Sequence, residues 1–89
     1  MALPSRHSDS LRQVVRDPRI LDGEPTIEGT RIPVRSIVQV FEVEGSIDII
    51  AEAFPPLDHR AIEQALSFYQ SHRREIDTYI AENQDDLPS

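Results

Sequence analysis

Residues 46–69 read SIDIIAEAFPPLDHRAIEQALSFY, and the two amphipathic runs in this stretch decide the fold. Apolar side chains recur in each run at the i, i+3, i+4 and i+7 spacing of one helix face: Ile47, Ile50, Ala51 and Phe54, then Ile62, Ala65, Leu66 and Tyr69. Pro55 and Pro56 end the first run, because proline cannot continue the amide ladder. Ser46 and Asp58 precede the two runs, and both are residue types that cap helix N-termini. The stretch therefore predicts two helices joined by a very short turn.

The same periodicity extends the helical region on both sides. An earlier helix is predicted by four apolar positions, and Gly45 ends it: Val34, Ile37, Val38 and Phe41. On the C-terminal side, Ile76 and Ile80 prolong the apolar stripe of the last helix. We expect that helix to start after Asp58 and to run to about Glu82. The spacing thus predicts a core of three helices.

The first third of the chain carries turn signals and β-branched residues instead of a helical period. Gly29 separates two short extended runs, residues 25–28 and 30–34, which predicts a hairpin or a tight bend. Pro25 and Pro33 lack an amide donor, so we expect these runs to be edges of any sheet. The expected fold is α+β and mainly α. In this expected fold, a short N-terminal β-like segment packs on a three-helix core of the helix-turn-helix kind.

The chain has 89 residues, which is enough for a single domain. We expect this domain to span residues 13–82, between a flexible arm at 1–12 and a frayed tail at 83–89. Cysteine is absent, which excludes disulfides and thiolate metal sites. No apolar segment reaches the roughly 20 residues that span a bilayer, so a cytoplasmic location is expected.

No group of residues has the spacing of a catalytic or metal-binding motif. The three histidines lie far apart along the chain, and the three glycines are too dispersed to form a phosphate-binding loop. The prediction is therefore that the protein is not an enzyme and has no metal or cofactor. The net charge of −7 is uneven: residues 1–35 hold six arginines and five acids, whereas residues 36–89 hold three arginines and eleven acids. Such an acidic second half suits a basic protein partner better than a purely electrostatic grip on nucleic acid.

Two short helices with a tight turn are typical of a helix-turn-helix, which suggests DNA binding. The second helix would present its first exposed side chains to a major groove: His59, Arg60, Glu63, Gln64 and Ser67. Arg60 has the chemistry to contact guanine or phosphate, and Gln64 that to read adenine. Arg31 and Arg35 are the nearest further cations and are expected to contact phosphates. The spacing is equally compatible with a plain helical corner that has solvated polar side chains.

The last part of the final helix is a candidate surface for a partner protein. Tyr69, Ile76 and Ile80 form an apolar stripe that extends past the predicted core, and such a stripe requires a covering surface. Arg73 and Arg74 lie beside it and could meet acidic groups on a partner or simply face solvent. Homodimerisation through the same stripe is an equally open interpretation.

The N-terminal third also carries a specific family signature. Residues 17–34 contain an Asp-Pro, then Gly-Glu-Pro at 23–25, and then Gly-Thr-Arg-Ile-Pro-Val at 29–34. This pattern strongly resembles the bacterial domain-of-unknown-function 433 family. The resemblance covers roughly residues 13–76 and continues through the Gly-Ser at 45–46 and the Pro-Pro-Leu turn at 55–57.

The resemblance implies a function for the chain. Members of this family look like winged or homeodomain-like helix-turn-helix proteins, and many resemble antitoxins of type II toxin–antitoxin pairs encoded beside a PIN-like ribonuclease toxin. By resemblance, the protein would bind and neutralise the toxin from the adjacent gene and repress its own operon by binding operator DNA as a homodimer. The alternatives are a free-standing transcriptional regulator and a protein-interaction module that does not bind DNA.

Overall fold

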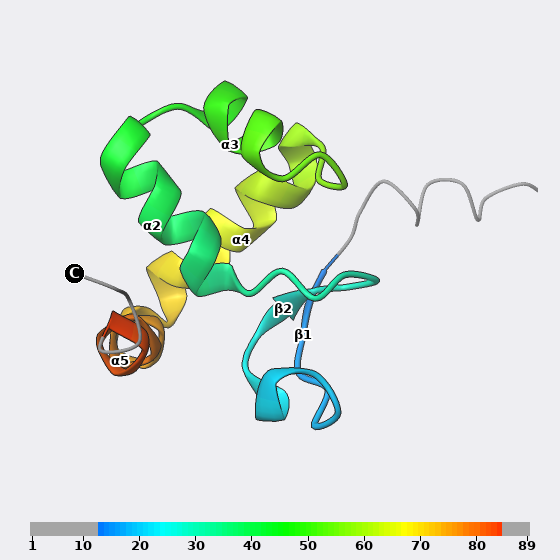
Figure 1. The fold of residues 1–89 in the computed structure, drawn as a ribbon, viewed down its shortest axis with the longest axis vertical. Helices are drawn as coiled ribbons and strands as arrows, with labels where there is room; N and C mark the ends of the chain where they lie inside the picture. Colours follow the sequence, from blue (N-terminus) through cyan, green and yellow to red (C-terminus); the bar gives the residue numbers. More distant parts are fainter. Residues whose placement is uncertain (1–12, 85–89) are drawn as a thin grey trace, which may run out of the picture.

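A computed structural model describes residues 13–84 of the protein (Figure 1). The expected arm at 1–12 and residues 85–89 of the expected tail lie outside the described residues. The elements in chain order are β1 Val14–Val15, the 3₁₀ turn η1 Leu21–Gly23, β2 Thr26–Ile27, α2 Val34–Glu44, α3 Ile47–Ala53, α4 His59–Ser71 and α5 Arg73–Gln84. The expectation of a mainly helical α+β fold is confirmed, although residues 13–84 contain four α-helices where the sequence predicts three.

The ends of the helices follow the local sequence signals. Gly45 closes α2 in the left-handed conformation, with φ of 65°, and its N–H donates to the carbonyl of Phe41. The Ser46 hydroxyl accepts from the N–H of Ile49 at 3.3 Å and begins α3. The Asp58 carboxylate accepts from the N–H of Ala61 at 2.9 Å and begins α4. These caps confirm the predicted boundaries between the three helices.

The small sheet contains a strand pairing that the sequence does not predict. β1 and β2 are antiparallel, with Val14 opposite Ile27 and Val15 opposite Thr26. The run after Gly29 adds a single bridge, from Pro33 to the other side of Thr26. β2 therefore lies between two neighbours. The expectation that residues 25–28 form an edge of the sheet is wrong. Pro25 is tolerated directly before β2 because it only needs to accept a hydrogen bond there. Its carbonyl accepts from the N–H of Val34 at 3.0 Å.

A tight bend at Gly29 is present as predicted. Gly29 has φ of 79°, a conformation that residues with a β-carbon resist. The Thr30 hydroxyl donates to the carbonyl of Ile27 at 2.8 Å and accepts from the N–H of Ile32 at 3.0 Å. These bonds satisfy the backbone of the bend and direct the chain into α2.

The core lies around α2, which contacts each of the other helices. Its side chains come from β2, from the connection after α3 and from all four helices: Ile27, Val34, Ile37, Val38, Ile50, Leu57, Ala61, Ile62, Ala65, Tyr69 and Ile76. The helical periodicity predicts most of these positions, because the buried face of each helix recurs every three to four residues. Every helix within residues 13–84 is too short or too polar to cross a bilayer.

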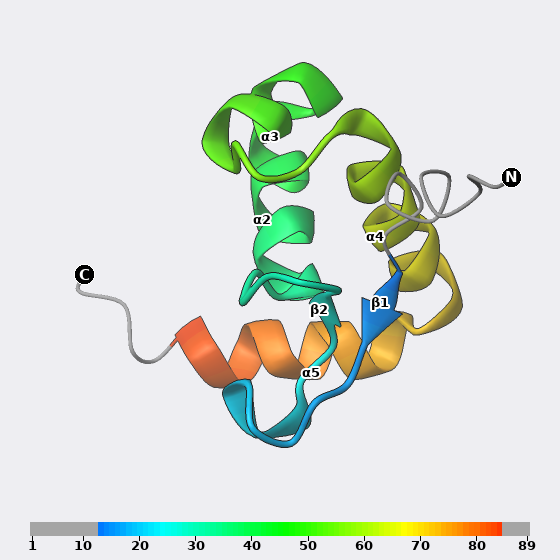
Figure 2. The same ribbon diagram turned by 90° about the vertical axis from the view of Figure 1, so that its right-hand side faces the viewer.

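The predicted long final helix is wrong, because the chain bends at His72. Its backbone has φ of −133° and ψ of 38°, and its N–H donates to the carbonyl of Tyr69 three residues earlier. α5 then turns back and runs beneath α2, as Figure 2 shows. The bend places Ile76 in the core with no exposed surface, and full burial of such a side chain stabilises by about 1.5–3 kcal/mol. That burial outweighs the local preference for a straight helix.

Candidate functional site

Ion pairs divide the arginines of residues 13–84 into two groups. Three of them are held by a carboxylate: Arg16 by Glu75, Arg19 by Asp17 and Arg35 by Glu24. The other four arginines of this part of the chain form no salt bridge there: Arg31, Arg60, Arg73 and Arg74. All four are exposed. An arginine without an acidic partner retains its donors for phosphate or carboxylate groups of another molecule.

The outer face of α4 carries the polar side chains that the sequence predicts for DNA contact. His59, Arg60 and Gln64 are all exposed, while Ala61, Ile62 and Ala65 face the core. A shallow hollow on this face is lined by Arg60, Glu63, Gln64 and Ser67. One guanidinium, one amide and one hydroxyl therefore lie together with one carboxylate. The set can donate to and accept from base edges, and it holds little positive charge.

His59 links the two helices of the predicted motif. Its Nε2 lies 2.9 Å from Oδ1 of Asp48 on α3, and both side chains are largely exposed. The pair lies at the start of α4, where the helix dipole is positive. His59 therefore lies on the outer face of α4, but its Nε2 is already in contact with the carboxylate of Asp48.

Arg35 has to be removed from the predicted DNA contacts. Its Nε lies 2.6 Å from Oε2 of Glu24, and the two side chains are only 18% and 6% exposed. Burial raises the pKa of Glu24 above its ordinary value, and the nearby guanidinium of Arg35 offsets part of that rise. If Arg35 turned to a phosphate, the Glu24 carboxylate would remain buried and unpaired, which is strongly unfavourable. The sequence does not reveal this pair, because Glu24 lies on a different element.

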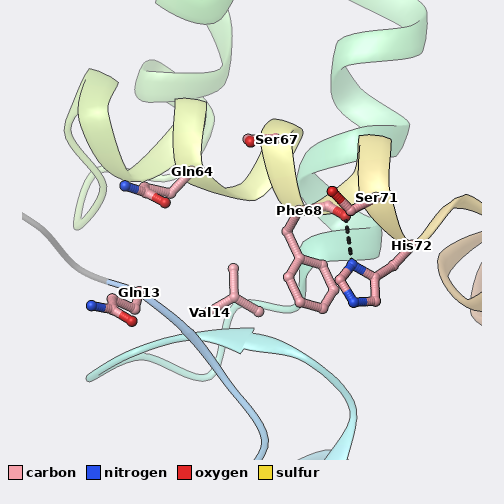
Figure 3. Close-up of a pocket in the computed structure, with 7 residues that line it drawn as sticks. All are labelled: Gln13, Val14, Gln64, Ser67, Phe68, Ser71 and His72. Carbon is pink, nitrogen blue, oxygen red and sulfur yellow. Dashed lines mark hydrogen bonds between the residues drawn. The ribbon is translucent and has the colours of Figure 1, made fainter.

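A groove that the sequence did not predict runs between β1 and α4 (Figure 3). Its volume is about 240 Å³, and it is lined by Gln13, Val14, Gln64, Ser67, Phe68, Ser71 and His72. The rings of Phe68 and His72 stack with centroids 3.9 Å apart and an angle of 5° between their planes. Nδ1 of His72 lies 3.0 Å from the carbonyl of Phe68, so this nitrogen carries the proton and donates. The helical spacing of Phe68 and His72 could have indicated their contact, but only the tertiary packing of β1 forms the groove.

The predicted apolar surface for a partner is largely part of the core. Ile76 is fully buried and Tyr69 is 9% exposed, so neither is available to a partner in this fold. The Tyr69 hydroxyl donates to Oδ1 of Asp77 at 2.8 Å, and this hydrogen bond raises the pKa of Tyr69. Ile80 is half-buried. The expectation of a free stripe is therefore wrong, for the same reason as the long helix: α5 folds back onto α2.

The two arginines beside this stripe remain accessible. The guanidinium of Arg73 lies 5.0 Å from the centre of the Tyr69 ring, in a cation–π contact. Arg74 lies at the rim of an apolar hollow on the outer face of α5, together with Thr78 and Tyr79. Both arginines are exposed at the start of α5. The structure thus leaves both arginines exposed in different surroundings and removes most of the apolar anchor expected beside them.

The elements described above define a small, mainly helical domain with one short antiparallel sheet. The chain matches the family model for "Protein of unknown function (DUF433)" over residues 14–69, more than half of its length, and it belongs to this family. Its fold is similar to the crystal structure of a DUF433 member protein from Anabaena variabilis ATCC 29413, with a TM-score of 0.73 and 24% sequence identity over 90% of this chain and 87% of that chain. No protein with a curated description matches it.

Proposed function

We propose that the protein is a DNA-binding transcriptional regulator of the antitoxin kind, in which α3 and α4 act as a helix-turn-helix. The observation that carries this proposal is the outer face of α4. Arg60 and Gln64 are exposed there in the first turns of the helix, and Arg60 has no acidic partner within residues 13–84. These are the positions and residue types with which a recognition helix contacts base edges.

The arrangement of the neighbouring elements supports a DNA-facing side. α3 and α4 are in contact and are separated by only residues 54–58. The turn that follows β2 extends to the same side of the molecule as the start of α4, at the right of Figure 1. This turn carries Arg31, which is exposed and has no acidic partner within the described residues. Arg31 can therefore contact a phosphate while α4 lies in the groove.

The small number of such cations determines how the protein binds. A homodimer would supply about four phosphate or guanine contacts from Arg31 and Arg60, and each phosphate contact adds about 0.9 to the slope of log affinity against log salt. A slope of at most about 3.6 follows, which means modest affinity outside low salt. Specificity would then depend on Arg60 and Gln64 more than on charge.

Fluorescence anisotropy with the DNA upstream of the gene tests this role. Arg31→Ala should reduce the salt slope of a dimer by about 1.8, whereas Gln64→Ala should change the preferred sequence and leave the slope unchanged. Arg19→Ala is a matched control, because Arg19 is exposed and already paired with Asp17. If the full-length protein does not bind this DNA at low salt, with or without its neighbouring gene product, DNA binding is refuted. The protein would then be a protein-interaction module.

The antitoxin part of the proposal rests on Arg73 and Arg74. Both are exposed without an acidic partner within the described residues, and a PIN-like ribonuclease holds its metal with clustered carboxylates that attract a cation. One guanidinium would pair with those carboxylates in bidentate geometry and inhibit the cytoplasmic toxin. Co-purification and RNA cleavage with the adjacent gene product test this, using Arg73→Ala with Arg74→Ala against Arg19→Ala. Full inhibition by the double variant would refute it, and no capture by the wild type would indicate a free-standing regulator.

A further inference from the structure

The bend between α4 and α5 is not caused by a helix-breaking residue. Residues 69–75 read YQSHRRE and contain neither glycine nor proline, and the local signal at the bend is Nδ1 of His72, which donates to the carbonyl of Phe68 at 3.0 Å in place of the backbone N–H. Nevertheless His72 leaves the helical conformation, and α5 begins at the next residue. A single side-chain hydrogen bond is a weak cause for such a bend, so contacts that α5 makes with the rest of the molecule must also maintain it.

The contacts with the most defined geometry can be named. Ile76 is buried against the core, and Glu75 accepts a hydrogen bond at 2.9 Å from Nη2 of Arg16, just after β1. Asp77 accepts from the hydroxyl of Tyr69 on α4. In each case the partner of α5 precedes the bend in the chain. A copy of α5 supplied by another molecule would satisfy the same partners.

We propose that α4 and α5 straighten into one continuous helix over residues 59–84 in a dimer that exchanges α5 between two copies of the chain. In that state α5 extends about 18 Å beyond the end of α4 and occupies the place of the partner's α5 beneath α2. Each copy recovers the buried Ile76 and the Arg16–Glu75 pair, and it adds helical backbone bonds across position 72. A short connection between two packed helices favours such an exchange, because little chain is available to relieve the bend.

The first test compares His72→Ala with His72→Gly in the full-length chain. Both changes remove the imidazole and its stacking on Phe68, so they differ only in the helix propensity of residue 72. Alanine favours the continuous helix and glycine disfavours it, once in each copy, so the dissociation constant of the dimer should be about 20-fold lower for His72→Ala. Sedimentation over a range of concentrations measures this constant. Equal constants for the two variants would overturn the proposal.

The second test distinguishes exchange from a side-by-side dimer. In Arg16→Glu two carboxylates would face each other within one copy, and in Glu75→Arg two guanidinium groups would do so. When the two variants are mixed, an exchanged heterodimer brings opposite charges together at both sites. Native mass spectrometry should therefore show the heterodimer in excess over either homodimer. A statistical mixture, or no dimer at all, would overturn the exchange of α5.

Discussion

Replacing Ile76 with alanine tests the placement of α5 directly. Ile76 has no exposed surface and belongs to the core cluster. Removing three buried carbons costs about 2.4 kcal/mol at about 0.8 kcal/mol each, and the cavity left behind raises the total to about 3 kcal/mol. A domain of this size has a free energy of unfolding of about 5 kcal/mol, so the variant should lose more than half of it. If the residue instead belonged to a free stripe on a protruding helix, the same change would leave stability nearly unchanged.

Urea unfolding followed by far-ultraviolet circular dichroism measures this effect. With a slope of about 1–1.5 kcal/mol per molar urea, the midpoint of Ile76→Ala should fall by about 2–3 M. Val43→Ala is the matched control, because Val43 is 81% exposed and its truncation should change the free energy of unfolding by less than about 0.5 kcal/mol. If Ile76→Ala and Val43→Ala unfold at the same urea concentration, α5 is not packed beneath α2.

Three further outcomes follow from the same contacts. Gly29→Val should lower the free energy of unfolding by about 1–2 kcal/mol, and Gly29→Asn should lower it by less. A β-carbon at this position meets nothing within 4 Å, so only the φ of 79° is unfavourable. Equal urea midpoints for the two variants would contradict a backbone effect. Asp58→Ala should lower the free energy of unfolding by about 1 kcal/mol and Ser46→Ala by less, since the capping hydrogen bond of Ser46 is longer, at 3.3 Å against 2.9 Å. Thermal unfolding measures both variants, and the reverse order of their melting temperatures would contradict this account of the caps. The hydrogen bond from Arg16 lowers the pKa of Glu75 below its ordinary value of 4.5. The coupling free energy between Arg16 and Glu75 in a double-mutant cycle should therefore be present at neutral pH and disappear as acid protonates Glu75 below pH 4.5. A coupling that persists at about pH 2 would contradict the pair.

The positions of the helices could be predicted where the signal is local. Gly45, Ser46 and Asp58 act on backbone groups within one turn of themselves, and the structure has α2, α3 and the start of α4 where these residues place them. The Gly-Thr-Arg-Ile-Pro-Val run at 29–34 indicated both the bend and the family. Exposure of Arg60 and Gln64 also followed from periodicity alone, because they lie opposite the apolar face.

The candidate site was only partly predictable, since its remaining features depend on which elements meet. β1 pairs along β2 in addition to the predicted run after Gly29, and this extra strand also creates the groove against Phe68 and His72. Arg35 is held by Glu24 only because α2 packs over the turn that carries Glu24. No periodicity reports on such a pairing between different elements.

The sequence by itself determined both ends of α2 and α3, the start of α4, the bend at Gly29, the family and the polar outer face of α4. The structural features in this set arise from interactions between residues within a turn of each other. Such interactions are the same in any compact fold. Only the tertiary structure decided that the chain turns at His72, that Ile76 is core and that Arg35 is unavailable to a ligand. Each of these outcomes depends on burying a side chain against a distant element. The free energy of that burial exceeds the differences of a few tenths to about 1 kcal/mol by which local propensities choose a conformation.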